Sequence, residues 1–126
     1  MDKILLIDDS LTVRMELKQA FAGEGYEIYE AENGEKAIET FRATSDIKLI
    51  ICDYNMPGKD GLTTISDIFQ INPEKPPLAL MLTTESSKTL KTKGREIGIS
   101  GWILKPYNKE VLLTGVRSIL QKHKQA

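Results

Sequence analysis

The chain has 126 residues with 17 basic and 18 acidic side chains, so its formal net charge is −1, which argues against binding nucleic acid through a broad basic surface. Its length fits one domain with its own core, and its single cysteine excludes an intramolecular disulfide and favours a reducing setting. The opening residues lack a signal-peptide pattern, and every apolar run is far shorter than the ~20 residues of a membrane helix. We therefore expect one cytoplasmic domain over residues 1–126, with neither nucleic acid nor membrane as a partner.

Apolar runs alternate with amphipathic stretches from one end of the chain to the other. The short runs predict strands, and the longer stretches, with apolar side chains three or four residues apart, predict helices. In chain order we expect a strand over 3–7, a helix over 11–23, a strand over 26–31, a helix over 33–43, a strand over 47–52, a helix over 61–72, a strand over 77–82, a helix over 86–98, a strand over 101–105 and a helix over 108–123.

Regular alternation of strands and helices predicts an α/β fold. Near-continuous apolar strands indicate a parallel sheet that is covered by helices on both faces. The second strand, 26–31, alternates apolar and polar side chains, which is typical of an edge strand. With right-handed crossovers, we expect a five-stranded parallel sheet of order 2-1-3-4-5, as in flavodoxin-like folds.

The expected helices differ in how much apolar surface they offer to this sheet. The first carries a stripe at spacing four, and the second has Asn33 as a plausible N-cap. The fourth offers only Leu90 and Ile97, and its interior Gly94 costs up to ~1 kcal/mol relative to Ala, so we expect it to open locally more readily than the last helix. The last helix offers five apolar side chains: Val111, Leu112, Val116, Ile119 and Leu120.

Chemically complementary side chains follow four of the expected strands, at the edge of the sheet where ligands bind in this class of fold. They are Asp8 and Asp9 after the first strand, Asp53 after the third, Thr83 and Thr84 after the fourth, and Lys105 after the fifth. Two carboxylates ~4 Å apart repel by ~4 kcal/mol at an effective dielectric of ~20, so three together need counter-charge. Lys105 supplies one positive charge, and Mg²⁺, which prefers carboxylate and phosphate oxygens, would supply the rest. The pattern predicts a magnesium site with Asp53 as a nucleophile toward phosphorus.

Four motifs, "IDDS", "CDYNMPGKDGL", "MLTTE" and "GWILKP", carry a resemblance that covers the whole chain. In this order and spacing they resemble the receiver domain of bacterial two-component response regulators, and especially its single-domain, CheY-like chemotaxis members. The resemblance implies that Asp53 accepts phosphate from a histidine kinase of the CheA type. It implies that Asp9, Asp53 and the backbone carbonyl of Asn55 bind Mg²⁺ directly, and that Asp8 acts through water.

The resemblance also implies roles around the phosphoryl group. Thr83 and Lys105 would contact it, and a cis bond between Lys105 and Pro106 would aim the ammonium at Asp53. Asn55 and Glu85 occupy the two positions that tune autodephosphorylation in the family. The domain is thus expected to be a phospho-acceptor signalling protein with intrinsic self-phosphorylation and autodephosphorylation, rather than a metabolic enzyme.

The output of such a domain is expected on the fourth helix, fifth strand and fifth helix. Thr83 and the aromatic residue at 102, here Trp in place of the usual Tyr or Phe, would form the switch. The partner face would comprise Lys88, Lys91, Arg95 and Trp102. The implied partners of the monomeric domain are a downstream protein such as a flagellar motor switch protein, and a phosphatase.

Other interpretations remain open at this point. The three cationic side chains can form an ordinary solvated face, and Trp102 can be plain core. The chain can act as a phosphate sink, or as a receiver of a larger regulator with a DNA-binding output, although it ends in a short polar tail. A Mg²⁺-dependent aspartyl-phosphate phosphohydrolase would share the nucleophile, but position 55 is Asn rather than a second acid or base, and no insertion is long enough for a cap. Cys52 is expected to be inert core, and His123 a solvated side chain.

Overall fold

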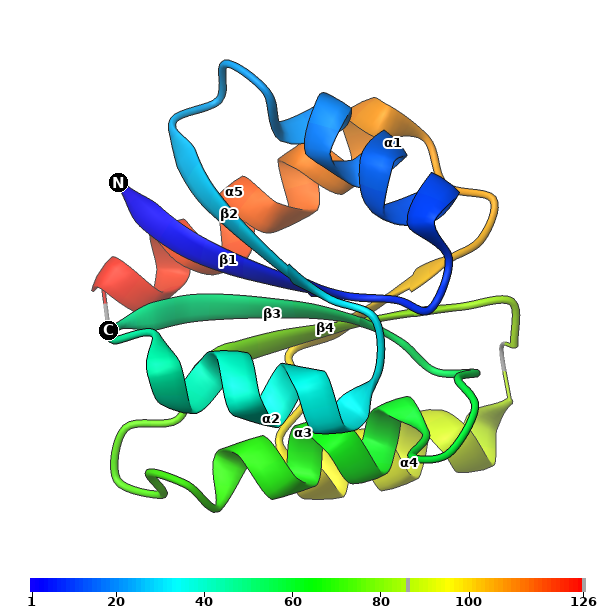
Figure 1. The fold of residues 1–126 in the computed structure, drawn as a ribbon. Coiled ribbons are helices and arrows are strands. Elements are labelled where there is room, and N and C mark those ends of the chain that lie inside the picture. Colours follow the sequence, from blue (N-terminus) through cyan, green and yellow to red (C-terminus); the bar gives the residue numbers. More distant parts are fainter. Residues whose placement is uncertain (86, 126) are drawn as a thin grey trace.

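Strands and helices alternate strictly in the computed structural model, which describes residues 1–85 and 87–125 (Figure 1). The elements are β1 (Asp2–Ile7), α1 (Leu11–Phe21), β2 (Tyr26–Ala31), α2 (Gly34–Ala43), β3 (Ile47–Asp53), α3 (Gly61–Phe69), β4 (Leu78–Thr83), α4 (Lys88–Ile97), β5 (Gly101–Leu104) and α5 (Lys109–Gln125). Each predicted element is present, with ends that differ by at most a few residues. Ser86, where the fourth helix was predicted to begin, lies outside the described residues.

The strands form a parallel sheet of order β2-β1-β3-β4-β5, which confirms the predicted fold. The strands at its centre are buried on both faces, which explains why β1, β3 and β4 read as continuous apolar runs. β2 lies at one edge, as its alternating sequence predicted. Most of its side chains are half-buried, without the alternation of buried and exposed positions that one-sided burial would give. All the carboxyl ends of the strands therefore meet at one rim.

Two layers of helices enclose the sheet, with α1 and α5 on one face and α2, α3 and α4 on the other (Figure 1). Successive strand residues point to opposite faces. In β1, Ile4 and Leu6 therefore pack with the α1–α5 core, whereas Leu5 and Ile7 pack with the α2–α4 core. No helix in the described part of the chain is both long and apolar enough to cross a membrane.

The buried face of α5 differs from the predicted one. Val111 was predicted to be buried, but its side chain is 62% exposed, and Leu113 is buried instead. The reason is the helical period: Leu112, Val116 and Leu120 lie one above another, and at ~100° per residue Val111 falls roughly 200° from Leu113. Apolar character alone therefore does not distinguish Val111 from the side chains of α5 that face the sheet.

Polar side chains just before the first two helices cap their N-termini. Asn33 caps α2 by accepting a hydrogen bond from the backbone of Lys36, as predicted. Ser10 caps α1 in the same way through the backbone N–H of Val13. Because Ser10 comes directly after Asp8 and Asp9, this cap fixes where the chain turns from the end of β1 into α1.

A charged cluster joins α1 to the edge strand β2 and leads to a first testable prediction. Arg14 and Lys18 donate hydrogen bonds to Glu30 at 2.9 and 2.8 Å. The bond from Lys18, and then that from Arg14, lowers the pKa of Glu30 below its usual value of 4.5. Since the folded-state pKa is the lower one, this stabilisation is present above the unfolded pKa and is lost as pH falls through the folded-state value.

Glu30→Gln should therefore lower the free energy of unfolding at neutral pH by less than about 1 kcal/mol, because the cluster is partly exposed. The deficit should shrink in high salt and vanish in acid, as measured by thermal melts. Glu39→Gln, which removes an exposed pair with Lys36 at 3.9 Å, is the control and should have little effect. A deficit of constant size across the acid range would show that packing, not charge, holds Glu30.

Candidate functional site

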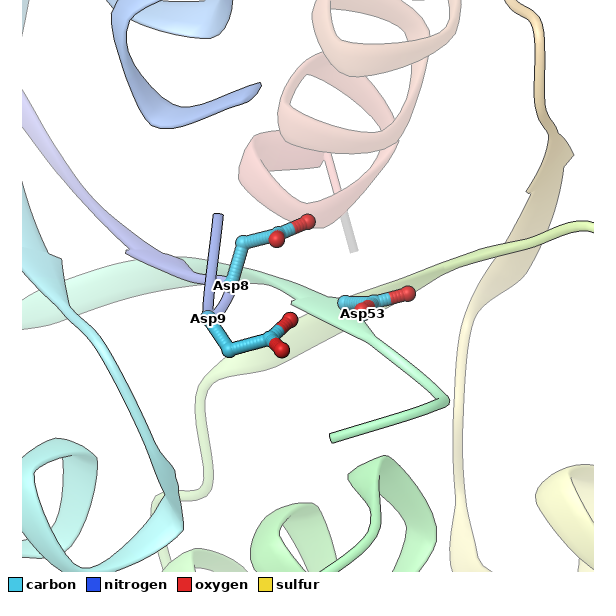
Figure 2. Close-up of side chains that lie close together, drawn as sticks. All are labelled: Asp8, Asp9 and Asp53. Carbon is cyan, nitrogen blue, oxygen red and sulfur yellow. The ribbon is translucent and has the colours of Figure 1, made fainter. Parts of the chain in front are cut away.

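Three carboxylates converge at the rim of the sheet, at the ends of two neighbouring strands. Ile7 of β1 lies opposite Cys52 of β3 in the strand register, so the next residues, Asp8 and Asp53, emerge side by side. One carboxylate oxygen from each of Asp8, Asp9 and Asp53 lies within 4.8 Å of the others. Figure 2 shows Asp8 and Asp9 following β1 and the carboxylate of Asp9 directed toward Asp53. Asp8 and Asp53 are buried, whereas Asp9 is exposed.

Lys105 reaches this cluster from the end of β5. Its ammonium donates hydrogen bonds to Asp8 Oδ2 and to Asp53 Oδ1, both at 3.2 Å. The expected cis bond between Lys105 and Pro106 is present. Burial alone would lower the pKa of Lys105, but the charges of Asp8 and Asp53 and their hydrogen bonds outweigh it and raise the pKa. Lys105 is therefore a fixed positive charge between two carboxylates.

The backbone around Asp8 is held by residues that the sequence analysis did not assign to the site. Asp8 Oδ1 accepts a hydrogen bond from the backbone N–H of Ser10 at 2.9 Å, and the Arg14 guanidinium donates to the Asp8 carbonyl at 2.7 Å. Ser10 could have been found, because a serine just before an apolar helical stripe is a typical N-cap. Arg14 had no such signal, because its second partner, Glu30, lies on another element.

Among the residues that the structure describes, the charged side chains that contact one another at this rim do not balance. Three carboxylates face one ammonium, so two negative charges are left over. Burial raises the pKa of Asp53, and the charge of Asp8 raises it further, while Lys105 opposes both. A compact set of hard carboxylate oxygens with this surplus fits a divalent cation such as Mg²⁺.

The chain after Asp53 passes closely over the end of β3. Gly61, the first residue of α3, donates its backbone N–H to the carbonyl of Tyr54 at 2.9 Å. A Cβ at Gly61 would lie only 2.5 Å from the Asp53 carbonyl oxygen and 2.8 Å from Met81 Sδ. Only glycine fits this close approach, which closes the loop that carries Asn55. The Asn55 side chain is exposed, and the role of its carbonyl stays a prediction.

A buried hydroxyl group lies at the end of β4, where the Thr83 carbonyl accepts a hydrogen bond from the backbone N–H of Lys105 at 2.9 Å. Thr83 is 1% exposed, and its Oγ1 accepts a hydrogen bond from the backbone N–H of Glu85 at 2.9 Å. A hydroxyl that accepts one bond still has its own proton to donate. In the strand register Leu104 lies opposite Thr83, and Trp102 lies opposite Met81. Because residues two apart in a strand point to the same face of the sheet, Trp102 lies on the same face as Thr83, two residues further from the rim.

Most of the other residues named in the sequence analysis lie on or near α4, while His123 lies on α5 and Cys52 in β3. Lys88 and Arg95 are exposed and Lys91 is half-buried, while Trp102 is half-buried against the α2–α4 core. Glu85 is exposed in the loop before α4, and His123 is exposed on α5. Cys52 is fully buried, and burial raises the pKa of its thiol well above the usual value, so it is inert core as predicted.

The chain matches a known family over most of its length. Residues 4–117 match the response regulator receiver domain. The chain is 34% identical over 119 residues to chemotaxis protein CheY1 of Helicobacter pylori, a match that covers 94% of this chain and 96% of that protein. It is 36% identical over 120 residues to the aerobic respiration control protein ArcA of Escherichia coli, covering 94% of this chain but only 48% of ArcA.

Solved structures agree with this assignment. The structure of the CheX–CheY–BeF₃–Mg²⁺ complex from Borrelia burgdorferi contains a chain that superposes with a TM-score of 0.87 at 26% identity. The alignment covers 94% of this chain and 89% of that one. The sheet order and the two helical layers are therefore those of a known structural family.

Proposed function

Because this chain belongs to the family of response regulator receiver domains, we propose that Asp53 accepts a phosphoryl group from a histidine kinase and that residues 1–126 form a single phospho-switch domain. The observation that carries this proposal is the position of Asp53. It lies buried at the end of β3, within reach of two further carboxylates and hydrogen-bonded to Lys105. The proposed role is signalling in the cytoplasm rather than metabolism.

The chemistry follows from the groups at the rim. A carboxylate oxygen of Asp53 attacks phosphorus, and the bond from phosphorus to the donor's imidazole nitrogen breaks, with its electron pair leaving on the imidazole. Lys105, already 3.2 Å from Asp53, is placed to neutralise a phosphoryl oxygen. The free proton of the Thr83 hydroxyl is available for a second one. When bound by Asp9, Asp53 and the Asn55 carbonyl, with Asp8 acting through water, Mg²⁺ would neutralise negative charge on the carboxylates and on the phosphoryl group.

We assign the output to chemotaxis, with a flagellar motor switch protein as the downstream partner. The support is the match to CheY1, which spans nearly the whole of both chains. The partner face would be formed by α4, β5 and α5, including Lys88, Lys91, Arg95 and Trp102. The CheX–CheY complex supports a further protein partner. A phosphatase, expected from the sequence, is a separate part of this proposal. Asn55 and Glu85 would then tune the rate at which the phosphoryl group is lost.

Phosphorylation of Asp53 is tested directly with acetyl phosphate and Mg²⁺. Intact-mass measurement should show one added phosphoryl group on the wild type and none on Asp53→Asn, because an amide cannot act as this nucleophile. Asp46→Asn is the matched control: Asp46 lies just before β3 at the opposite end of that strand, and Asn tolerates its φ of 65°. An added phosphoryl group on Asp53→Asn would contradict the assignment.

A further inference from the structure

Gly94 lies in the middle of α4, where glycine disfavours a helix. Its backbone does not require glycine, since its φ lies outside the left-handed region that Gly23, Gly25, Gly58 and Gly98 occupy. The reason for glycine here is space. A Cβ at Gly94 would fall on Cζ2 of the Trp102 indole, 3.2 Å from its Cη2 and 3.3 Å from Ile99 Cδ1.

The indole therefore occupies the space that a side chain of α4 would otherwise fill. Trp102 reaches this position from β5, and packs with the core that includes Leu90 and Ile99. The two residues are complementary: position 102 carries the bulky indole of Trp, and position 94 has no side chain. If the indole swung outward, it would leave a hole beneath α4, which close-packed interiors do not tolerate without collapse.

We propose that Gly94 is the positioning residue of the switch: it lets the Trp102 indole rest inward beneath α4 and makes α4 and β5 shift together. The packing of Trp102 against Gly94 is observed directly, whereas its consequence for signalling rests on the proposed function. Lys88, Lys91 and Arg95 lie on the same helix as Gly94. Seating or releasing the indole would therefore move this cationic face as one unit.

The first test compares two glycines within helices. A Cβ added at Gly115 in α5 would meet nothing within 4 Å, so Gly115→Ala should raise the melting temperature through helix propensity. Gly94→Ala should lower it instead, because the methyl group overpacks the indole. Trp102 is the only tryptophan, and acrylamide quenching of its emission should rise about twofold in Gly94→Ala as the indole is displaced, but not in Gly115→Ala. Equal quenching in wild type and Gly94→Ala overturns the proposal.

A second background keeps the test decisive if Gly94→Ala folds poorly. In Trp102→Leu the space beside Gly94 is no longer filled by the indole, so adding Gly94→Ala should raise the melting temperature measured by circular dichroism. A change of sign between the two backgrounds is the signature of a direct contact. If Gly94→Ala lowers the melting temperature equally in both, the two residues act independently and the proposal is wrong.

The signalling consequence is tested by phosphorylation. With acetyl phosphate and Mg²⁺, the emission of Trp102 should change in wild type and in Gly115→Ala, and the change should shrink in Gly94→Ala phosphorylated to the same extent by mass. A response of wild-type size in Gly94→Ala, or none in phosphorylated wild type, overturns the role of the pair in switching. If wild type takes up no phosphate, the proposed function fails, while the melting and quenching results still decide the positioning role.

Discussion

Millimolar Mg²⁺ should raise the melting temperature of the wild-type protein, and Asp9→Asn should remove most of that rise. The pocket carries two negative charges more than Lys105 can neutralise, so we expect a divalent cation to bind the folded chain and to relieve repulsion that the unfolded chain does not have. A ligand that binds only the folded state stabilises it by about 2.7 kcal/mol at 100 times its dissociation constant. Thermal melts with Mg²⁺ and with a chelator measure the difference.

The substitutions separate metal binding from a general effect of salt. Asp46→Asn, which removes a carboxylate at the far end of β3, should keep the full response. In chelator, Asp53→Asn should melt at a higher temperature than the wild type, because the burial and the Asp8 charge that raise the Asp53 pKa no longer act against an ionised group. A wild type that is insensitive to Mg²⁺, or an Asp9→Asn protein with a full response, would contradict the metal site.

The position of these carboxylates was predictable from the sequence because two simple rules act together. Parallel strands end at the same rim, and the apolar runs before Asp8 and Asp53 mark which strands lie next to each other in the middle of the sheet. Neither rule needs knowledge of side-chain packing. The N-cap at Asn33 was predictable for the same reason, since a cap depends on residues only three positions apart.

Features that depend on packing between elements could not be predicted in this way. The contact of Arg14 with the Asp8 carbonyl requires the turn into α1 and the edge of β2 to be in place at once. Gly94 looked like a weakness of the fourth helix, because nothing local shows that the indole of Trp102 fills the space beside it. Val111 was misassigned because one apolar residue beside a helical stripe cannot be told from a member of it.

The pocket couples its chemistry to the stability of the fold, since the same charges serve both. Asp8 is almost fully buried, and among the described residues it is the Lys105 ammonium that forms an ion pair with its carboxylate. A carboxylate in this position is tolerated because it also accepts the N–H of Ser10. Removal of the ammonium would leave charges that the backbone bond alone cannot compensate.

Lys105→Gln should therefore destabilise the metal-free protein by about 2–3 kcal/mol, somewhat below the ~3–5 kcal/mol typical when one partner of a fully buried pair is removed, because Lys105 is partly exposed. Mg²⁺ should then raise the melting temperature of Lys105→Gln by more than that of the wild type, since the cation replaces charge that the substitution removed. Lys109→Gln, at the exposed start of α5, is the control and should match the wild type in both conditions. If metal-free Lys105→Gln melts like the wild type, the two ion pairs contribute little, and the surplus of negative charge cannot be what draws a cation to this rim.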